Sequence, residues 1–168
     1  MTPNSLPATL AETFASEYDR CRRRVHELAE PLTDDQFWTK PFEYGNSFGH
    51  LVLHLTGNLS YYIGSQVAQT GYVRTRDREF TDPARRPKAD VMRAFDETVD
   101  MVLETLAAQR AEDWTAPYFG EREPDAHTRF HIFLNCAMHF YHHVGQMIYL
   151  ERQLSTGVRA GEVREDKS

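Results

Sequence analysis

Two pairs of histidines four residues apart are the part of this chain best suited to chemistry. His139 and His143 lie in the run 135–151, whose apolar residues recur with helical spacing, and His50 and His54 repeat the interval upstream. In an α-helix, residues four apart lie on one face, roughly 40° apart around the axis, with their side chains stacked. Two such helices can therefore bring three imidazoles to one divalent cation.

The residues around these histidines are apolar, which bears on what the imidazoles do. His54 is flanked by leucines and a valine, and His139 by Met138 and Phe140. Three buried imidazoles without partners would cost about 1–3 kcal/mol each, whereas a shared cation satisfies one lone pair on every ring. The third ligand would be His54 or, alternatively, His50 in the first turn of its helix. The other explanation is that the histidines are hydrogen-bonded in the core, or face water, and bind nothing.

Gln146 and His142 are the polar neighbours of this cluster. Gln146 follows His143 by three residues on the same stripe, so its amide could orient a ligand imidazole or a water at the metal; a polar contact between helices explains it equally well. His142 points roughly 60° away from His139, which favours a place at the rim or an interface.

The HEXXH motif of zinc proteases is absent because Phe140 stands where its glutamate would be. No serine lies in a nucleophile-elbow pattern either.

Composition narrows the class of protein. The 168 residues are 40% hydrophobic and carry a net charge of −6, without a lysine- and arginine-rich block, which argues against nucleic-acid binding. Cys21 and Cys136 are far apart and lack metal-type spacing, so we interpret them as reduced thiols, small core residues of a cytoplasmic protein. The chain shows no signal-peptide pattern and no apolar run approaching the length of a membrane span, so we expect no membrane association.

Helical periodicity dominates the chain and predicts an all-α, four-helix bundle, a fold in which sites are built from inward-facing side chains on facing helices. A long polar loop, residues 70–87, joins the second and third long helices and could cover a site. We expect residues 1–157 to form a single domain and residues 158–168 to be a disordered tail. The expected long helices cover residues 7–30, 46–68, 87–110 and 126–154, and a capping box predicts a short helical turn at 34–38.

Two runs of this sequence resemble the DinB-like (YfiT-type) metal-binding four-helix bundles: LTDDQFWTKPFEYGNSFGHLVLHLTGNLSYYI, residues 32–63, and MHFYHHVGQMIYL, residues 138–150. The resemblance implies a bundle that is usually dimeric, with a nickel- or zinc-like ion bound by one histidine of the second helix and two of the last. The ligands would then be His54, His139 and His143. Some members are thiol-dependent enzymes, including bacillithiol S-transferases and mycothiol-dependent maleylpyruvate isomerases, and many have no established activity. Val144 stands where relatives often have arginine, so no role of that arginine carries over.

These observations predict a metal-dependent enzyme. Three protein ligands leave coordination positions open, as catalytic zinc-type sites do, and an ion there could lower the pKa of a thiol or a water. We predict a homodimeric transferase or hydrolase that uses zinc or nickel and a low-molecular-weight thiol or water on a small-molecule substrate. The 70–87 loop and the aromatic residues Trp38, Tyr61 and Tyr62 would shape its pocket, unless those aromatics belong to the core. The alternatives are a metal-binding or stress-response protein without turnover, and a purely structural bundle.

Overall fold

The computed structural model describes residues 5–81, 84–120 and 125–155. Every regular element in these ranges is helical, apart from a single β-bridge between Pro117 and Thr128. The prediction of an all-helical protein is therefore confirmed.

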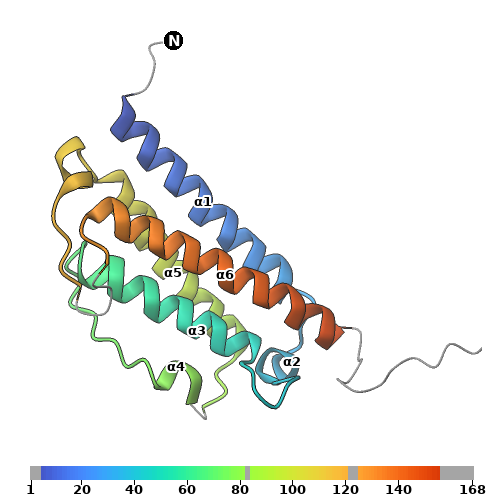
Figure 1. Cartoon of the computed structure of the whole chain (residues 1–168). Coiled ribbons are helices and arrows are strands. Elements are labelled where there is room, and N and C mark those ends of the chain that lie inside the picture. Colours follow the sequence, from blue (N-terminus) through green and yellow to red (C-terminus); the bar gives the residue numbers. More distant parts are fainter. Residues whose placement is uncertain (1–4, 82–83, 121–124, 156–168) are drawn as a thin grey trace, which may run out of the picture.

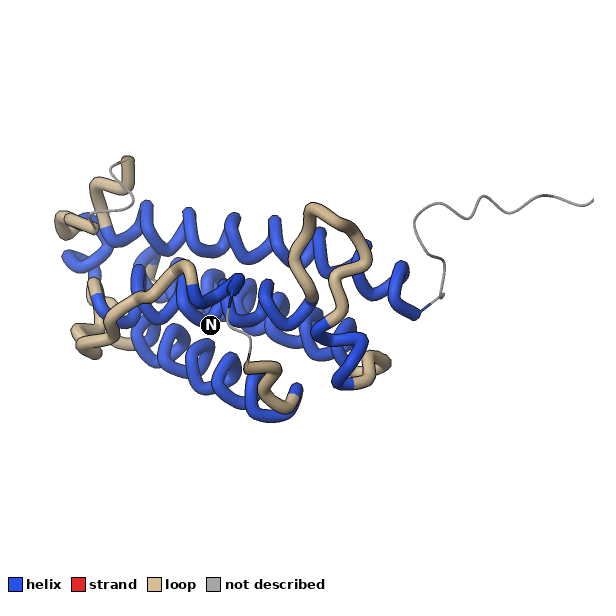
Figure 2. Tube along the Cα trace, turned by 90° about the horizontal axis from the view of Figure 1, so that it is seen from below, coloured by secondary structure: helices blue, strands red, loops and turns tan. Residues whose placement is uncertain are grey.

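Four long helices lie side by side, and Figure 1 shows them with their connections. α1 packs against α5 and α6, and α3 packs against the same two helices, which places α1 and α3 at opposite corners. In the view turned by 90°, the long helices again run alongside one another and loops join them at both ends (Figure 2). The helices are α1 (Leu6–Ala29), α2 (Asp34–Trp38), α3 (Phe48–Leu59), α4 (Arg78–Thr81), α5 (Lys88–Ala107) and α6 (Arg129–Ser155), with a 3₁₀ turn at Ala111–Thr115.

Local capping signals determine where α2 and α3 begin. Thr33 Oγ1 accepts a hydrogen bond from the Gln36 N–H at 3.2 Å, and Gln36 Oε1 accepts one from the Thr33 N–H at 2.9 Å, which is the predicted capping box. Ser47 Oγ accepts a hydrogen bond from the His50 N–H at 3.1 Å and caps α3. Because the start of α3 is set by Ser47, the face on which His54 lies is set as well.

The second long helix differs from its prediction in its last turns. Instead of continuing as an α-helix to residue 68, the chain widens into a π-helical segment at Ser60–Ser65. The Gln66 N–H donates to the Tyr61 carbonyl at 3.2 Å and the Ala68 N–H to the Ile63 carbonyl at 2.9 Å, both five residues back. Gln69 and Gly71 then take positive φ values of 56° and 75°, which ends the helix.

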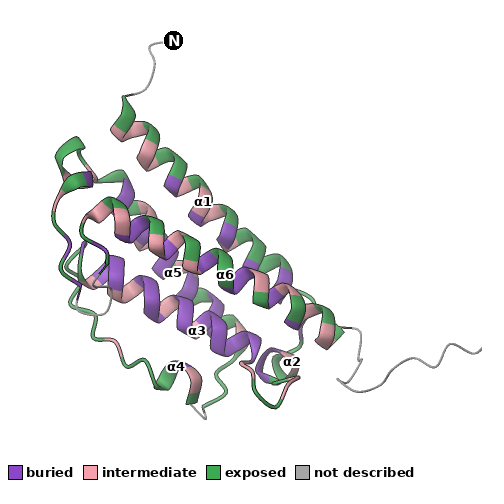
Figure 3. Cartoon of the chain, in the orientation of Figure 1, coloured by how far each residue is buried: buried purple, intermediate pink, exposed green. Residues whose placement is uncertain are grey.

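The core lies where α3 meets α5 and α6, and α3 is the most deeply covered helix (Figure 3). All its residues except Leu53 and Thr56 are buried. Large side chains from every long helix fill the core, among them Tyr18, Leu55, Phe95, Phe133 and Phe140. A continuous apolar core of this kind supplies most of the driving force for folding.

The expected loop between α3 and α5 is an extended segment that contains one helical turn, α4, and packs along α3. Trp38 Nε1 donates a hydrogen bond to the Arg86 carbonyl at 2.9 Å and ties the far end of this segment to α2. The segment therefore lies against the helix that carries His54.

Both cysteines are buried and neither forms a disulfide. Burial raises the pKa of the Cys21 thiol to about 11, so this side chain is a neutral core residue rather than a nucleophile.

Among the described residues, none of the helices has the length and apolar character required to cross a membrane. The predicted disordered tail, residues 158–168, falls outside the described residues.

Candidate metal centre

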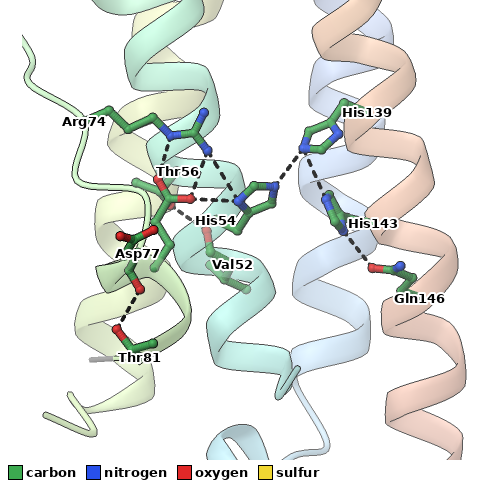
Figure 4. A network of polar contacts seen from close by, with 10 residues as sticks. Val52, His54, Thr56, Arg74, Asp77, Thr81, His139, His143 and Gln146 are labelled. Carbon is green, nitrogen blue, oxygen red and sulfur yellow. Dashed lines mark hydrogen bonds and ion pairs between the residues drawn. The ribbon is translucent and has the colours of Figure 1, made fainter. Parts of the chain in front are cut away.

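Three imidazoles from two helices converge on one point. His54 projects from α3, and His139 and His143 project from neighbouring turns of α6 (Figure 4). His139 Nε2 lies 2.9 Å from His54 Nε2 and 3.2 Å from His143 Nε2. One nitrogen of each ring lies within 4.8 Å of those of the other two.

These separations are close to those of ligands around one ion. With Zn–N bonds of 2.0–2.1 Å, tetrahedral ligand nitrogens lie about 3.3–3.4 Å apart. The two closest pairs of ring nitrogens, at 2.9 Å and 3.2 Å, need to separate by only a few tenths of an ångström. The set is therefore a fitting site for a divalent ion.

A buried carboxylate holds His54 in place. Glu79 of α4 accepts a hydrogen bond from His54 Nδ1, with 2.7 Å between nitrogen and Oε2. Because an ionised carboxylate can only accept, Nδ1 carries the proton and Nε2 presents its lone pair to the other two rings. Arg74 Nη2 is 3.4 Å from the same Nδ1, which is too long to displace this hydrogen bond.

The charge of Glu79 is balanced by a nearly buried arginine. Arg74 Nε and Nη2 lie 2.7 Å and 2.9 Å from the two carboxylate oxygens, a bidentate pair. Burial alone would raise the pKa of Glu79, but the hydrogen bonds from His54 and Arg74 outweigh it and hold that pKa below its usual value. Glu79 is therefore ionised at neutral pH and accepts from His54.

Gln146 orients His143 in the same way. Its Oε1 lies 2.8 Å from His143 Nδ1, and its Nε2 lies 3.2 Å from the ring of the exposed His142. With the amide oxygen accepting from Nδ1, the Nε2 lone pair of His143 also points at the cluster. Two lone pairs thus face His139 Nε2, which has at most one proton to offer them.

Two of the ligand candidates, His139 and His143, are neutral at physiological pH. Burial, followed by the adjacent histidines, lowers the pKa of His139 to about 3. Burial lowers the pKa of His143 to about 4, against an opposing contribution from the Gln146 hydrogen bond. Neutral imidazole is the form that binds metal, so no proton has to leave these two rings before an ion binds.

The alternative ligand, His50, lies apart from the cluster. Its Nδ1 is 2.7 Å from Ser47 Oγ, and its ring packs edge-on against Trp38 at 5.4 Å between centroids. His50 is thus part of the start of α3. His131 of α6 is absent from the residues that line the cavity beside the cluster.

A cavity of about 440 Å³ opens beside His54 and His139. Of the three aromatic residues expected to shape a pocket, Tyr62 lines this cavity, whereas Tyr61 does not and Trp38 lines a separate hollow beside His50. The cavity is lined by His54, Asn58, Tyr62, Arg74, Arg76, Ile132, Asn135, Cys136, Met138 and His139. Its size is in the range of small-molecule sites.

Sequence reasoning missed Glu79 and Arg74. Both lie in the segment expected to be a loop, and nothing local marks their partners. The one signal was Gly57, three residues after His54, where an added Cβ would lie 2.2 Å from Glu79 Oε1. A glycine at this point of an otherwise apolar helix indicates that another group approaches its backbone closely.

The protein-family model described as the DinB superfamily matches residues 17–147, which include α3, α4, α5 and all three clustered histidines. The search of curated proteins gave no match.

Proposed function

Because this chain belongs to the DinB superfamily, we propose that it binds a divalent ion, zinc or nickel, through Nε2 of His54, His139 and His143 and acts as a transferase or hydrolase. When bound, the ion would lower the pKa of a low-molecular-weight thiol or water that occupies an open position. The proposal includes a four-helix bundle for the long helices, supported by their packing in adjacent pairs.

The observation that carries the proposal is the orientation of two ring nitrogens. Glu79 accepts from His54 Nδ1 and Gln146 from His143 Nδ1, so both Nε2 lone pairs face the same space as His139 Nε2. Without a cation, two acceptors share one proton, an unfavourable arrangement for half-buried and buried rings. A divalent ion would satisfy all three nitrogens at once.

The protein side chains supply positioning and access. Arg74 and Glu79 hold His54, and Gln146 holds His143, so the ligand geometry is formed by the folded chain. The ring of Phe80 covers His54 at 4.8 Å between centroids. The cavity leaves one side of the cluster open to a substrate.

Metal content tests the site directly. Protein purified without a histidine tag should contain about one zinc or nickel ion per chain by elemental analysis, and His139→Ala should lose it. His26→Ala is the matched control, because His26 is paired with Asp96 on the surface and lies outside the cluster. Stoichiometric metal in His139→Ala would contradict the ligand assignment.

A metal-binding protein without turnover is the second candidate, and the cavity lining favours it. No carboxylate is among the lining residues, so within the described part of the chain the cavity offers no obvious general base apart from the ligand histidines. Metal-loaded protein assayed with glutathione, bacillithiol and mycothiol against an electrophile such as 1-chloro-2,4-dinitrobenzene separates the candidates. Turnover above that of His139→Ala supports the enzyme, and its consistent absence supports the binder.

The proposal also includes a homodimer that uses the outer face of α6. Half of the exposed large hydrophobic side chains in the described part of the chain belong to this helix: Phe130, Leu134, Met138, Tyr141 and Tyr149. Their spacing of three, four or eight residues places them on one side, opposite the buried Phe133, Phe140 and Met147. A second copy of the same helix would cover this surface. Cytoplasmic location stays a prediction.

A further inference from the structure

We propose that the cavity beside the three histidines binds a small organic anion, a carboxylate or phosphate ester, whose charged group lies against Arg76 and Arg74. The far end of this ligand would reach the cluster of imidazoles, and in that respect the inference rests on the proposed function. The charge of the lining, the free hydrogen-bonding groups and the placement of the residues each support it.

The cavity is basic in an acidic protein. The chain has a net charge of −6, yet the described residues that line the cavity include two arginines and no carboxylate. Glu79 balances the charge of Arg74 from behind. Arg76 makes no ion pair within the described residues, and its guanidinium lies over the ring of Phe80 at 5.8 Å. One positive charge therefore remains for a ligand, before any contribution from a metal ion.

The guanidinium of Arg74 is held rigidly and has donors to spare. Its Nε and Nη2 are used by Glu79, and it lies over the ring of Tyr62 at 5.5 Å. Nη1 makes no hydrogen bond within the described residues, and in Figure 4 it points away from the carboxylate. A pre-positioned N–H group beside an unpaired guanidinium is an arrangement suited to a carboxylate or phosphate oxygen.

A buried amide oxygen offers a hydrogen-bond acceptor to the ligand. Asn58 is only 6% exposed and lines the cavity, and its Oδ1 has no hydrogen-bond partner among the described residues. An unsatisfied buried amide oxygen costs about 1–3 kcal/mol, which a hydroxyl or N–H of a ligand would recover. A ligand that donates to Asn58 would therefore be favoured in this cavity.

The helices place these groups one turn from the metal ligands. Asn58 follows His54 by four residues on α3, and Asn135 precedes His139 by four residues on α6. Residues four apart share a helix face, so each helix presents a carboxamide next to an imidazole. A ligand along this face would lie within reach of the ion, the two amides and the two arginines.

A pair of probes that differ only in charge tests this inference. Succinic acid monohydroxamate carries a hydroxamate, which chelates zinc, and a carboxylate; its amide analogue has the same size and no charge. Calorimetry with zinc-loaded protein should give at least tenfold tighter binding of the carboxylate probe. Equal affinities would overturn the proposal.

Variants of the cavity arginine test whether the preference for the carboxylate probe arises in the cavity. Arg76→Gln should abolish the preference for the charged probe, and Arg76→Lys should keep part of it. Arg78→Gln is the matched control, because Arg78 is an exposed arginine two residues away that does not line the cavity. A preference that survives in Arg76→Gln contradicts the assignment. Competition by inorganic phosphate compared with acetate shows which kind of anion the cavity prefers.

The anion site can be tested separately from the metal site. In metal-free protein, the Nε–H resonances of Arg74 and Arg76 can be followed by NMR during titration with succinamate and with neutral succinamide. Shifts with succinamate alone support the anion site even if the histidines bind no metal. Identical shifts with both compounds, or no shifts at all, overturn the anion site even if the histidines bind a metal ion.

Discussion

At the scale of single residues, Glu79 connects a segment of the chain to the chemistry of the site. It lies 25 residues from His54 in sequence, yet its carboxylate is 2.7 Å from the imidazole Nδ1. Partners of this kind fix the tautomer and orientation of a ligand histidine and raise its basicity. The function of Glu79 therefore depends on a residue, Arg74, that holds its charge in place.

Glu79→Gln should weaken zinc binding by about 10–100-fold, because the loss of such a partner leaves the ligand ring free to rotate. A competition titration with a chromophoric chelator measures the affinity. Asp77→Asn is the control, since Asp77 is an exposed acid of the same segment. Unchanged affinity in Glu79→Gln would contradict the positioning role. Arg74→Gln keeps the carboxylate and should lose less affinity than Glu79→Gln.

Acid should destabilise the metal-free protein before its carboxylates are protonated. In the unfolded chain, His139 and His143 take up protons below about pH 6.5, whereas their folded pKa values are about 3 and about 4. Between these limits the unfolded state binds more protons, so the free energy of unfolding falls as the pH falls from about 6.5 towards 4. The groups that face these rings are His54, His142 and Arg74, and all disfavour a further positive charge on His139.

Urea unfolding at pH 7 and pH 5 measures this effect. His143→Gln should show a smaller loss of stability between the two pH values than the unsubstituted protein, because one of the two depressed groups has been removed. An equal loss in both proteins would mean that His143 is not buried in its neutral form.

At the scale of elements, the site requires α3 and the 70–81 segment to approach closely, and Gly57 permits it. The Cβ of any other residue at position 57 would meet the Glu79 carboxylate, with 2.2 Å to Oε1. The helix interior would otherwise favour alanine over glycine by about 0.5–1 kcal/mol. At this position, close approach takes precedence over helix propensity.

Gly57→Ala should therefore lower both zinc affinity and stability, because Glu79 has to move away from His54. Gly145→Ala is the matched control in a helix: nothing lies within 4 Å of its added Cβ, so it should gain about 0.5–1 kcal/mol. Chemical unfolding at equal protein concentration measures the stability of the two variants, and the chelator titration measures their zinc affinity. A neutral or stabilising Gly57→Ala would show that α4 is not held against α3.

The features predicted from sequence were those with local causes. The Thr33 capping box and the stacked pair His139 and His143 both depend on neighbours within four residues. The choice between His54 and His50 was harder, because both lie on α3 and the structure separates them only through the partners of each ring. Arg74 and Glu79 could not be predicted, since their role depends on the path of an irregular segment across α3.

At the scale of the whole molecule, α6 has a double role. Its inner face supplies two of the three clustered histidines, and its outer face carries an apolar stripe that the described chain leaves exposed. Surfaces of this kind on small proteins commonly mark an interface. A second copy of the chain is the occupant we propose.

Leu134→Glu should reduce the mass in solution from that of a dimer to that of a monomer, because a charge in the middle of a symmetric apolar interface is repeated on both copies. Light scattering coupled to size-exclusion chromatography measures the mass. Val73→Glu is the control, since Val73 is a highly exposed apolar residue outside α6. A monomeric unsubstituted protein would contradict the proposed dimer.

The wide turn at Ser60–Ser65 has a consequence for how the chain tolerates changes in length. A π-turn accommodates one residue more than the same stretch of α-helix, so it is where an extra residue can be absorbed. His54 and Asn58 precede the turn, so a change of length within the turn leaves their position on the face of α3 unchanged. We expect that deletion of a single residue within the turn would restore regular winding and alter the exit towards Gly71, while the face that carries the imidazole and the amide keeps its direction.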